Sequence, residues 1–334
     1  MELDLPFIWA GIIAFAVLTY VVLDGFDLGI GILFPFHPDE SDRNVMMNSV
    51  APVWDGNETW LVLGGGGLLA VFPLAYAIVM PALYMPIILM LLALVFRGVA
   101  FEYRWRTKRW KPVWDVAFAG GSTIAALMQG IALGALVQGI KVEGRAYAGG
   151  WWDWLTPFSI LTGVAVVAGY ALLGATWLVL KTEGPLHDRM RERAKPLAFA
   201  TLGFIGLVSL LTPFKDPVYF QNWFSWPGIV LALPVPLLVA LAAWKLITGL
   251  RDDRDLTPFL AAQSLFILSF AGLGISFYPH IVPPSLTIQQ AAAPDASLAF
   301  TLVGTAILMP LILAYTAYAY WVFRGKIDPD TGYH

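Results

Sequence analysis

The sequence contains no cysteine and little charge. None of its 334 residues is cysteine, which excludes disulfide bonds, iron–sulfur clusters and thiolate-bound metals. Only 13% of the residues are charged, against about 25% in a typical soluble domain. By contrast, 58% are hydrophobic and the mean hydropathy is +0.71. We therefore expect an integral membrane protein. The net charge of −3 and the lack of a basic arm give no reason to expect a nucleic-acid partner.

Apolar runs recur along the whole chain. Each is near the roughly 20 residues that cross a bilayer as an α-helix. They predict an all-α protein with nine transmembrane helices, over residues 8–33, 50–72, 75–96, 116–140, 158–180, 197–211, 227–247, 259–277 and 297–323. The connections are mostly short and contain proline and charged residues that stop helices. We expect a single transmembrane domain over residues 1–334 that includes a short tail at 324–334.

Lysine and arginine gather in alternate connections. The odd-numbered connections and the tail hold most of them, whereas the even-numbered connections contain only Lys141, Arg145 and Lys215. Connections rich in these residues stay on the cytoplasmic side of a membrane. This pattern predicts an N-terminus outside the cell membrane and a C-terminus in the cytoplasm.

Two pairs of carboxylates interrupt the apolar pattern. Asp24 and Asp27 lie about two turns from the inner end of the first predicted helix, and Asp55 and Glu58 lie in the first turns of the second. The i, i+3 spacing places the members of each pair on one helix face. Both pairs should therefore lie at a similar depth, in the cytoplasmic third of the membrane.

Arg97 and Glu102 follow the third predicted helix and should reach the same level. A carboxylate that faces lipid costs a few kcal/mol, so these groups should face the bundle interior or a hydrated cavity. Such a cluster can take up and pass on protons, which favours a proton pathway that opens to the cytoplasm. Alternatively, the carboxylates serve only structure, by pairing with Arg97 or capping helices.

Small and weakly polar residues mark expected helix contacts. Gly25 and Gly29 form a GxxxG spacing, which lets membrane helices approach closely. Gln129 and Gln138 on the fourth predicted helix should hydrogen-bond to neighbouring helices. The four histidines, His37, His187, His280 and His334, all fall in predicted connections or the tail. Since a haem between helices usually needs His or Met at membrane depth, this chain alone is not expected to bind one.

Four segments of the sequence resemble one protein family. LDGFDLGIGIL, APVWDGNETWLVLGGGGL, FRGVAFEYR and YPHIVPPSLTI are similar to segments of subunit II of the bacterial cytochrome bd quinol oxidases. The similarity runs from the first helix to the tail. The last segment is most similar to the cyanide-insensitive branch of that family.

The resemblance implies a fold and a partner. The fold would be two four-helix bundles plus a peripheral helix, in the bacterial inner membrane with the N-terminus in the periplasm. The partner would be a similarly folded subunit I that carries haem b and haem d, or haem b only, and oxidises ubiquinol. Oxygen would be reduced to water with cytoplasmic protons, which generates a proton-motive force by charge separation. This chain would hold no cofactor, and a structural quinone, a phospholipid and a small single-helix subunit are further candidate partners.

The resemblance also assigns roles to residues. Proton delivery carries over to Asp55 of WDGNETW, with Glu58, Asp24 and Asp27 as further members of the pathway. Some relatives carry Gln at the position of Glu58, so Glu58 is either a proton carrier or merely tolerated there.

Three further residues match family positions. Arg97 and Glu102 match the charged pair after the third helix, in a supporting role. Trp60 matches an aromatic residue near a route for oxygen.

Two other classes of function compete with this interpretation. A stand-alone proton-coupled transporter would also need membrane carboxylates, but its polar groups should lie near the midplane on broken helices. Here they gather toward one face, which favours a half-channel that feeds a partner. The third possibility is a scaffold that only stabilises subunit I.

Overall fold

The computed structural model describes residues 4–327, and almost all of the regular structure is helical. The long helices are α1 Leu5–Leu33, α3 Trp54–Val71, α5 Tyr84–Arg106, α6 Lys111–Val137, α7 Pro157–Lys181, α8 Gly184–Leu211, α11 Pro234–Arg251, α12 Leu256–Phe277 and α14 Asp295–Val322. The shorter helical segments are η1 Phe34–Phe36, α2 Glu40–Asn48, α4 Pro73–Ala82, η2 Thr212–Phe214, α9 Pro217–Phe224, α10 Gly228–Ala232 and α13 Ile288–Ala291. Four short strands form two antiparallel hairpins, β1 Val142–Glu143 with β2 Ala146–Tyr147, and β3 His280–Val282 with β4 Leu286–Thr287.

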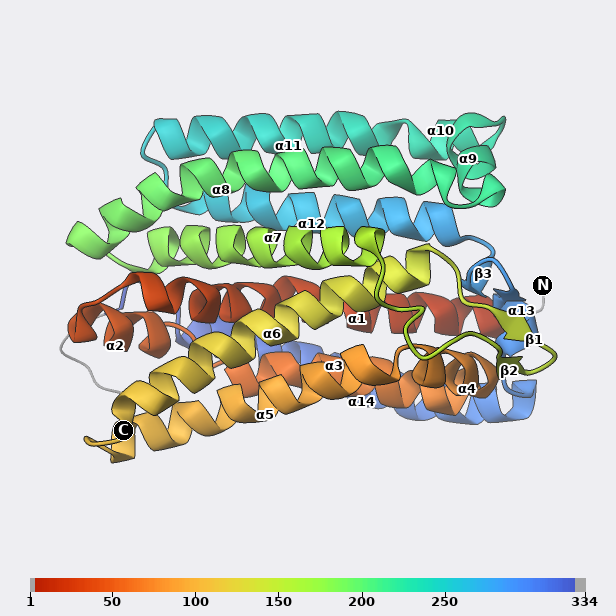
Figure 1. Ribbon diagram of the computed structural model, residues 1–334, viewed down its shortest axis with the longest axis horizontal. Helices are drawn as coiled ribbons and strands as arrows, with labels where there is room; N and C mark the ends of the chain where they lie inside the picture. Colours follow the sequence, from red (N-terminus) through yellow and green to blue (C-terminus); the bar gives the residue numbers. More distant parts are fainter. Residues whose placement is uncertain (1–3, 328–334) are drawn as a thin grey trace.

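The long helices run roughly side by side (Figure 1). Both hairpins lie at one end of the molecule, here called the hairpin end. The other, called the α2 end, contains α2, the end of α1 and the end of α14. Within residues 4–327, eight helices are long and apolar enough to cross a membrane. The expected all-α membrane fold is therefore confirmed.

The second predicted span, at 50–72, corresponds to α3 and is not among these eight. It has 18 residues, but its first turns carry Asp55, Asn57 and Glu58. With these polar groups, α3 has no 18-residue stretch as apolar as those of the eight spanning helices. It nevertheless packs along α1 inside the bundle.

Two predicted spans are interrupted in the structure. The helix expected at 75–96 is divided at Leu83 into α4 and α5. Pro86 has no N–H to donate to the carbonyl of Ala82, and this missing hydrogen bond favours the break at Leu83. In the same way, α10 and α11 divide the span expected at 227–247, where Pro234 and Pro236 lack donors.

Two other helices extend beyond their predicted ends. Helix α8 begins at Gly184 instead of 197, and α5 continues to Arg106 instead of ending at 96. The added turns are rich in Arg, Lys and Glu, which form helices well outside the membrane. Ion pairs hold them, including Arg189 with Asp42.

Glycines bring α1 and α7 together at the centre of the molecule. A Cβ atom at Gly29 would lie 1.8 Å from the carbonyl oxygen of Tyr170, and one at Gly25 would lie 2.8 Å from the Tyr170 ring. Gly174 of α7 meets the backbone of Gly29 from the other side. The GxxxG spacing is confirmed as a close helix contact.

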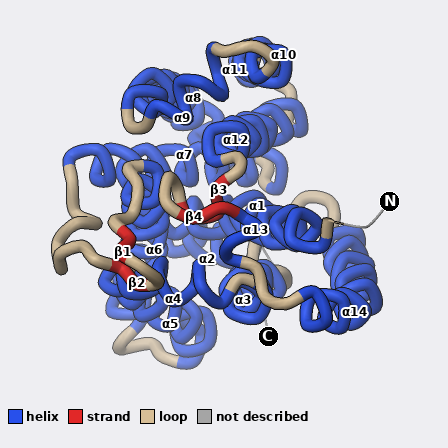
Figure 2. The backbone as a smooth tube through the Cα atoms, turned by 90° about the vertical axis from the view of Figure 1, so that its right-hand side faces the viewer, coloured by secondary structure: helices blue, strands red, loops and turns tan. Residues whose placement is uncertain are grey.

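Helix α14 lies at the edge of the molecule (Figure 2). Only 6% of its most apolar window is buried within the chain, against 67% for α7. It contacts α1 and α3 along one side. Most of its surface is therefore available to lipid or to another protein.

Candidate functional site

The side chain of Arg97 lies at the centre of a buried cluster of carboxylates. Its Nη1 donates a hydrogen bond of 2.6 Å to Oε1 of Glu58, and its Nη2 lies 3.8 Å from Asp24 and 3.9 Å from Asp27. The side chains of Arg97, Asp24 and Asp27 are fully buried, and that of Glu58 is 24% exposed. Helices α1, α3 and α5 thus bring three of the four predicted proton carriers to one guanidinium.

Arg97 is hydrogen-bonded to Glu58 but lies further from Asp24 and Asp27. Nη2 of Arg97 has no hydrogen-bond partner in the part of the chain that the structure describes, and Asp24 interacts with the hydroxyl of Tyr20 one turn earlier on α1. Buried polar atoms usually have a partner. Arg97 is therefore ion-paired with the two aspartates without a direct hydrogen bond to either.

A second line of hydrogen bonds leads away from Asp27. Asn57 donates from Nδ2 to Oδ2 of Asp27 at 2.7 Å, and its Oδ1 accepts from the hydroxyl of Tyr320 at 2.9 Å. Asn57 is 1% exposed. This line connects Asp27 to α14, and the sequence analysis missed both Asn57 and Tyr320.

A third line extends from the cluster towards α7. Tyr170 donates to Oε1 of Gln129 at 2.9 Å, and Gln129 donates from Nε2 to the hydroxyl of Tyr20 at 2.7 Å. Tyr20 lies one turn before Asp24 on α1. The expected interhelical hydrogen bonds of Gln129 are confirmed. Gln138 instead accepts from Thr156, at the cap of α7.

Asp55 and Glu102 do not join the cluster. Asp55 is exposed on the surface of this chain, so the expectation that it faces the interior is wrong for the chain taken alone. The buried residues of α3, Asn57, Trp60, Gly64 and Val71, show why. They follow the helical period and turn Asp55 outward.

Glu102 also points away from Arg97. It pairs with Arg106, one turn further along α5, at 3.7 Å, and its side chain is 58% exposed. Because α5 continues through this region as a regular helix, residues five positions apart face different sides. The two members of the predicted charged pair therefore do not contact each other.

Trp60 is buried between α1 and α14. It packs with Ala16 and Tyr20 and meets the ring of Phe15 edge to face at 5.9 Å. The Trp60 side chain is 1% exposed. In this chain Trp60 fills a packed apolar contact.

The three described histidines lie at helix ends or in a hairpin. His37 follows η1, and burial lowers its pKa. His187 lies in the first turn of α8, not in a connection as predicted, and His280 lies in β3. His334 is outside the described residues. None of these positions offers an axial haem ligand in the middle of a span, and within residues 4–327 no group of three or more potential ligands could hold a metal ion.

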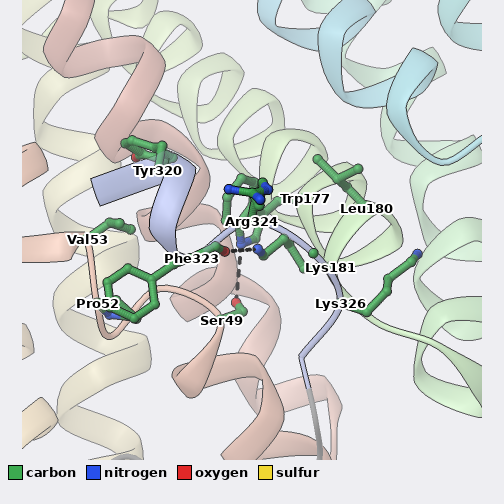
Figure 3. A pocket seen from close by; sticks show the side chains of 11 residues that line it. Ser49, Pro52, Val53, Trp177, Leu180, Lys181, Tyr320, Phe323, Arg324 and Lys326 are labelled. Atoms are coloured by element: carbon green, nitrogen blue, oxygen red, sulfur yellow. Dashed lines mark hydrogen bonds between the residues drawn. The ribbon is translucent and has the colours of Figure 1, made fainter. Parts of the chain in front are cut away.

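A cavity of about 380 Å³ opens near the cluster at the α2 end. It lies between the segment that joins α2 to α3, the end of α7 and the end of α14 (Figure 3). Tyr320, which donates to Asn57, is one of the residues that line it. The cavity and the carboxylate cluster are therefore on either side of Tyr320 and Asn57.

These features define a polytopic helical membrane protein with a buried acidic cluster between α1, α3 and α5. Residues 5–323 match the profile of the family described as cytochrome bd terminal oxidase subunit II. The chain belongs to this family. It is therefore a subunit of a quinol oxidase complex and a multi-pass protein of the bacterial inner membrane.

Individual relatives agree with this assignment. The chain is 31% identical to the cytochrome bd-I ubiquinol oxidase subunit 2 of Escherichia coli K12, over 98% of this chain and 96% of that protein. It is 28% identical to the cytochrome bd ubiquinol oxidase subunit 2 of Bacillus subtilis, over 96% of each chain. A solved chain of the bd oxidase from Geobacillus thermodenitrificans superposes with a TM-score of 0.76 at 18% identity, over 96% of this chain and 99% of that one.

Proposed function

We propose that this chain is the haem-free subunit II of a ubiquinol:oxygen oxidoreductase, and that its carboxylate cluster delivers cytoplasmic protons to a haem-bearing subunit I. Membership of the family supports the partnership. The observation that carries the proton pathway is the buried meeting of Glu58, Asp24 and Asp27 around Arg97. In this proposal the partner holds haem b with haem d, or haem b only, and reduces oxygen to water.

The charge of the cluster favours exchangeable protons over a purely structural role. Three carboxyl groups face one guanidinium, and no other basic side chain of the described part of the chain lies within 4 Å of them. A single cation balances one carboxylate, and excess buried charge costs several kcal/mol per ion. Bound protons would remove that excess. Protons that reside on carboxyl groups near water can also leave them.

The orientation follows from the distribution of basic residues. The α2 end contains ion pairs of Arg43 and Arg104 with Asp115, and of Arg191 with Asp255. Because basic residues stay on the cytoplasmic side, we assign the α2 end to the cytoplasm and the N-terminus to the periplasm. In this proposal α3 counts as a spanning helix, so eight of the nine long helices form two four-helix bundles and α14 is the peripheral ninth. The cluster lies near the cytoplasmic face, and its proton uptake would make the reaction electrogenic.

Asp55 completes the pathway at the surface of the chain. It lies in the first turn of α3, three residues from Glu58, and its side chain is exposed. A carboxylate on an outer helix face needs water or a partner's polar groups beside it. We assign that surface to the passage of protons between Glu58 and subunit I.

Other finer assignments follow the resemblance. Trp60 would adjoin a route for oxygen, and Arg97 would hold the carboxylates in place. Glu102 would support the end of α5 outside the cluster, through its ion pair with Arg106. A structural quinone, a phospholipid and a small single-helix subunit are proposed to join the complex. If the chain belongs to the cyanide-insensitive branch, oxygen uptake by the complex should persist in millimolar cyanide. A cyanide titration of oxygen uptake tests this.

The experiment compares carboxylate variants in the assembled complex. Glu58→Gln, Asp27→Asn and Asp55→Asn should each lower quinol-dependent oxygen uptake by about 10²-fold or more, the usual range for a lost proton-transfer group. The haem spectrum should stay that of the wild type. Glu102→Gln is the matched control, because Glu102 contacts only exposed Arg106. If all three variants retain haem and turn over at the wild-type rate, the proton pathway is wrong and the chain serves only as a scaffold for subunit I.

A second experiment separates the oxidase from a stand-alone transporter. Tagged chain is purified from its native membrane, and the sample is tested for haem by an optical difference spectrum and for quinol-dependent oxygen uptake. A haem-bearing partner with oxidase activity is expected. A stable chain without partner or haem would point to the transporter.

A further inference from the structure

The cavity at the α2 end has preformed walls. Trp177 of α7 donates to Oγ of Ser49 at 3.3 Å, and Lys181 donates to the backbone carbonyl of Phe323 at 2.6 Å. These bonds, visible in Figure 3, tie the end of α7 to the segment before α3 and to the end of α14. The walls between them are mainly apolar and include Val53 and Leu180. The volume of about 380 Å³ is enough for several water molecules.

Two hydrogen-bonded side chains link this cavity to the acidic cluster. Tyr320 lines the cavity and donates its hydroxyl to Oδ1 of Asn57. Asn57 in turn donates to Asp27 at 2.7 Å and to the carbonyl of Leu23 at 3.3 Å. One hydrogen bond between α3 and α14 thus lies between the cavity and a fully buried carboxyl group.

We propose that this cavity is the cytoplasmic mouth of the proton pathway and that the Tyr320–Asn57 hydrogen bond is the barrier at its inner end. The proposal rests on the proposed function of the cluster and gives it a point of access, different from the surface at Asp55. The amide of Asn57 has no titratable proton, and the hydroxyl of Tyr320 is held by its hydrogen bond to that amide, so we treat both as positioning residues. When Tyr320 swings away from Asn57, a hydrated proton in the cavity can transfer to an Asp27 oxygen and leave water behind.

The position of α14 makes this movement feasible. The helix is almost unburied within the chain, and near its end it is held by the Lys181 bond to Phe323 and by Tyr320 itself. The Tyr320 ring itself packs edge to face against Phe26 of α1 and Trp177 of α7, with ring centroids 6.4 Å apart in both pairs. The movement therefore takes the hydroxyl of Tyr320 away from Asn57 past these two rings.

Thiol labelling tests whether the cavity contains water. The chain has no cysteine, so a single introduced one is unique in this subunit. Leu180→Cys in the whole complex is treated with a small water-soluble thiosulfonate, in inverted vesicles and in spheroplasts. We expect modification of the subunit, read by mass, only from the cytoplasmic side, together with a severalfold loss of oxygen uptake. Val53→Cys is the second variant if the first does not assemble.

Leu241→Cys is the matched control. Leu241 is 48% exposed on α11, away from the cavity, and should face lipid. It should resist the reagent in both preparations. A Leu180→Cys complex that is protected until lipid is removed would show that an anionic lipid fills the cavity. That result would overturn the proposal.

Tyr320→Phe tests the barrier itself. The variant lacks the hydrogen bond that closes the inner end of the cavity, so we expect turnover at saturating quinol to rise about two- to tenfold at alkaline pH, where protons are scarce and their entry limits the rate. Near neutral pH the turnover should match that of the wild type, and the KM for quinol should not change. Tyr318→Phe on the same helix is the control, because Tyr318 is 61% exposed. An unchanged pH profile for Tyr320→Phe would contradict the barrier.

The two levels of the proposal fail differently. If Glu58→Gln abolishes turnover while the cavity cysteine stays unmodified, the cluster conducts protons but the mouth lies elsewhere. If neither the cluster variants nor labelling affects turnover, the proton pathway itself is wrong.

Discussion

Arg97 of α5 and Glu58 of α3 form the shortest contact of the buried cluster, at 2.6 Å, and they also fix its geometry. The guanidinium presents its other terminal nitrogen to Asp24 and Asp27 of α1. Its plane also lies over the ring of Phe101, 5.3 Å from the centroid. Three helices are therefore connected through one side chain, and four predictions follow from this arrangement and its surroundings.

Arg97→Gln should prevent assembly. The substitution leaves three carboxyl groups buried without a cation, and removing one partner of a buried ion pair costs about 3–5 kcal/mol. We expect at least a tenfold loss of haem-containing complex per milligram of membrane protein. Arg97→Lys should recover part of it. Arg106→Gln is the control, because the Arg106 side chain is 79% exposed, and wild-type levels of Arg97→Gln complex would contradict the prediction.

Gly29→Ala should force α1 and α7 apart. The new methyl group would lie 1.8 Å from the carbonyl oxygen of Tyr170, which is backbone and cannot move alone. Overpacking of this kind costs about 1–3 kcal/mol. We expect a lower melting temperature of the purified complex, measured by tryptophan fluorescence. Gly11→Ala on the same helix meets no atom of this chain within 4 Å and should melt like the wild type.

Tyr170→Phe should destabilise the chain through Gln129. The hydroxyl of Tyr170 is the donor for Oε1 of Gln129, and a buried acceptor left without a donor costs about 1–3 kcal/mol. Gln129→Leu should cost a similar amount. Combined with Tyr170→Phe, it should cost less than the sum, because both changes remove the same hydrogen bond. Strict additivity in thermal unfolding would mean that the two side chains are not coupled.

Asp255 should make the stability of the α2 end depend on pH. Burial raises the pKa of Asp255, but the hydrogen bonds from Lys326 and His187 outweigh it and hold the pKa below its usual value. Arg191 also lies 2.7 Å from the same carboxylate. The stabilisation is complete above the unfolded pKa of about 4 and is lost as the pH falls through the lower folded pKa.

A comparison of the wild type with Asp255→Asn measures this effect. The difference in melting temperature between the two should be large at pH 6 and should shrink as the pH falls below about 4. Asp252→Asn is the control, because the Asp252 side chain is 46% exposed and its ion pair, at 3.5 Å, is with exposed Arg251. A difference that stays constant with pH would show that Asp255 acts without its charge.

The fold class could be predicted from the sequence, because the length and hydrophobicity of a membrane helix are local properties of the chain. Apolar runs located eight spanning helices within residues 4–327. The positions of Asp24, Asp27 and Glu58 near one membrane face followed from their places along those helices. The motifs around them also identified the family.

Which side chains meet could not be predicted before the helices were packed together. The direction of a side chain depends on the rotation of its helix about its own axis, and packing fixes that rotation. Thus Asn57 is buried while Asp55 faces outward, and Glu102 turns away from Arg97. Tyr320 reaches Asn57 across 263 positions of sequence. Such contacts have no local pattern, because they exist only once α14 has packed against α1 and α3.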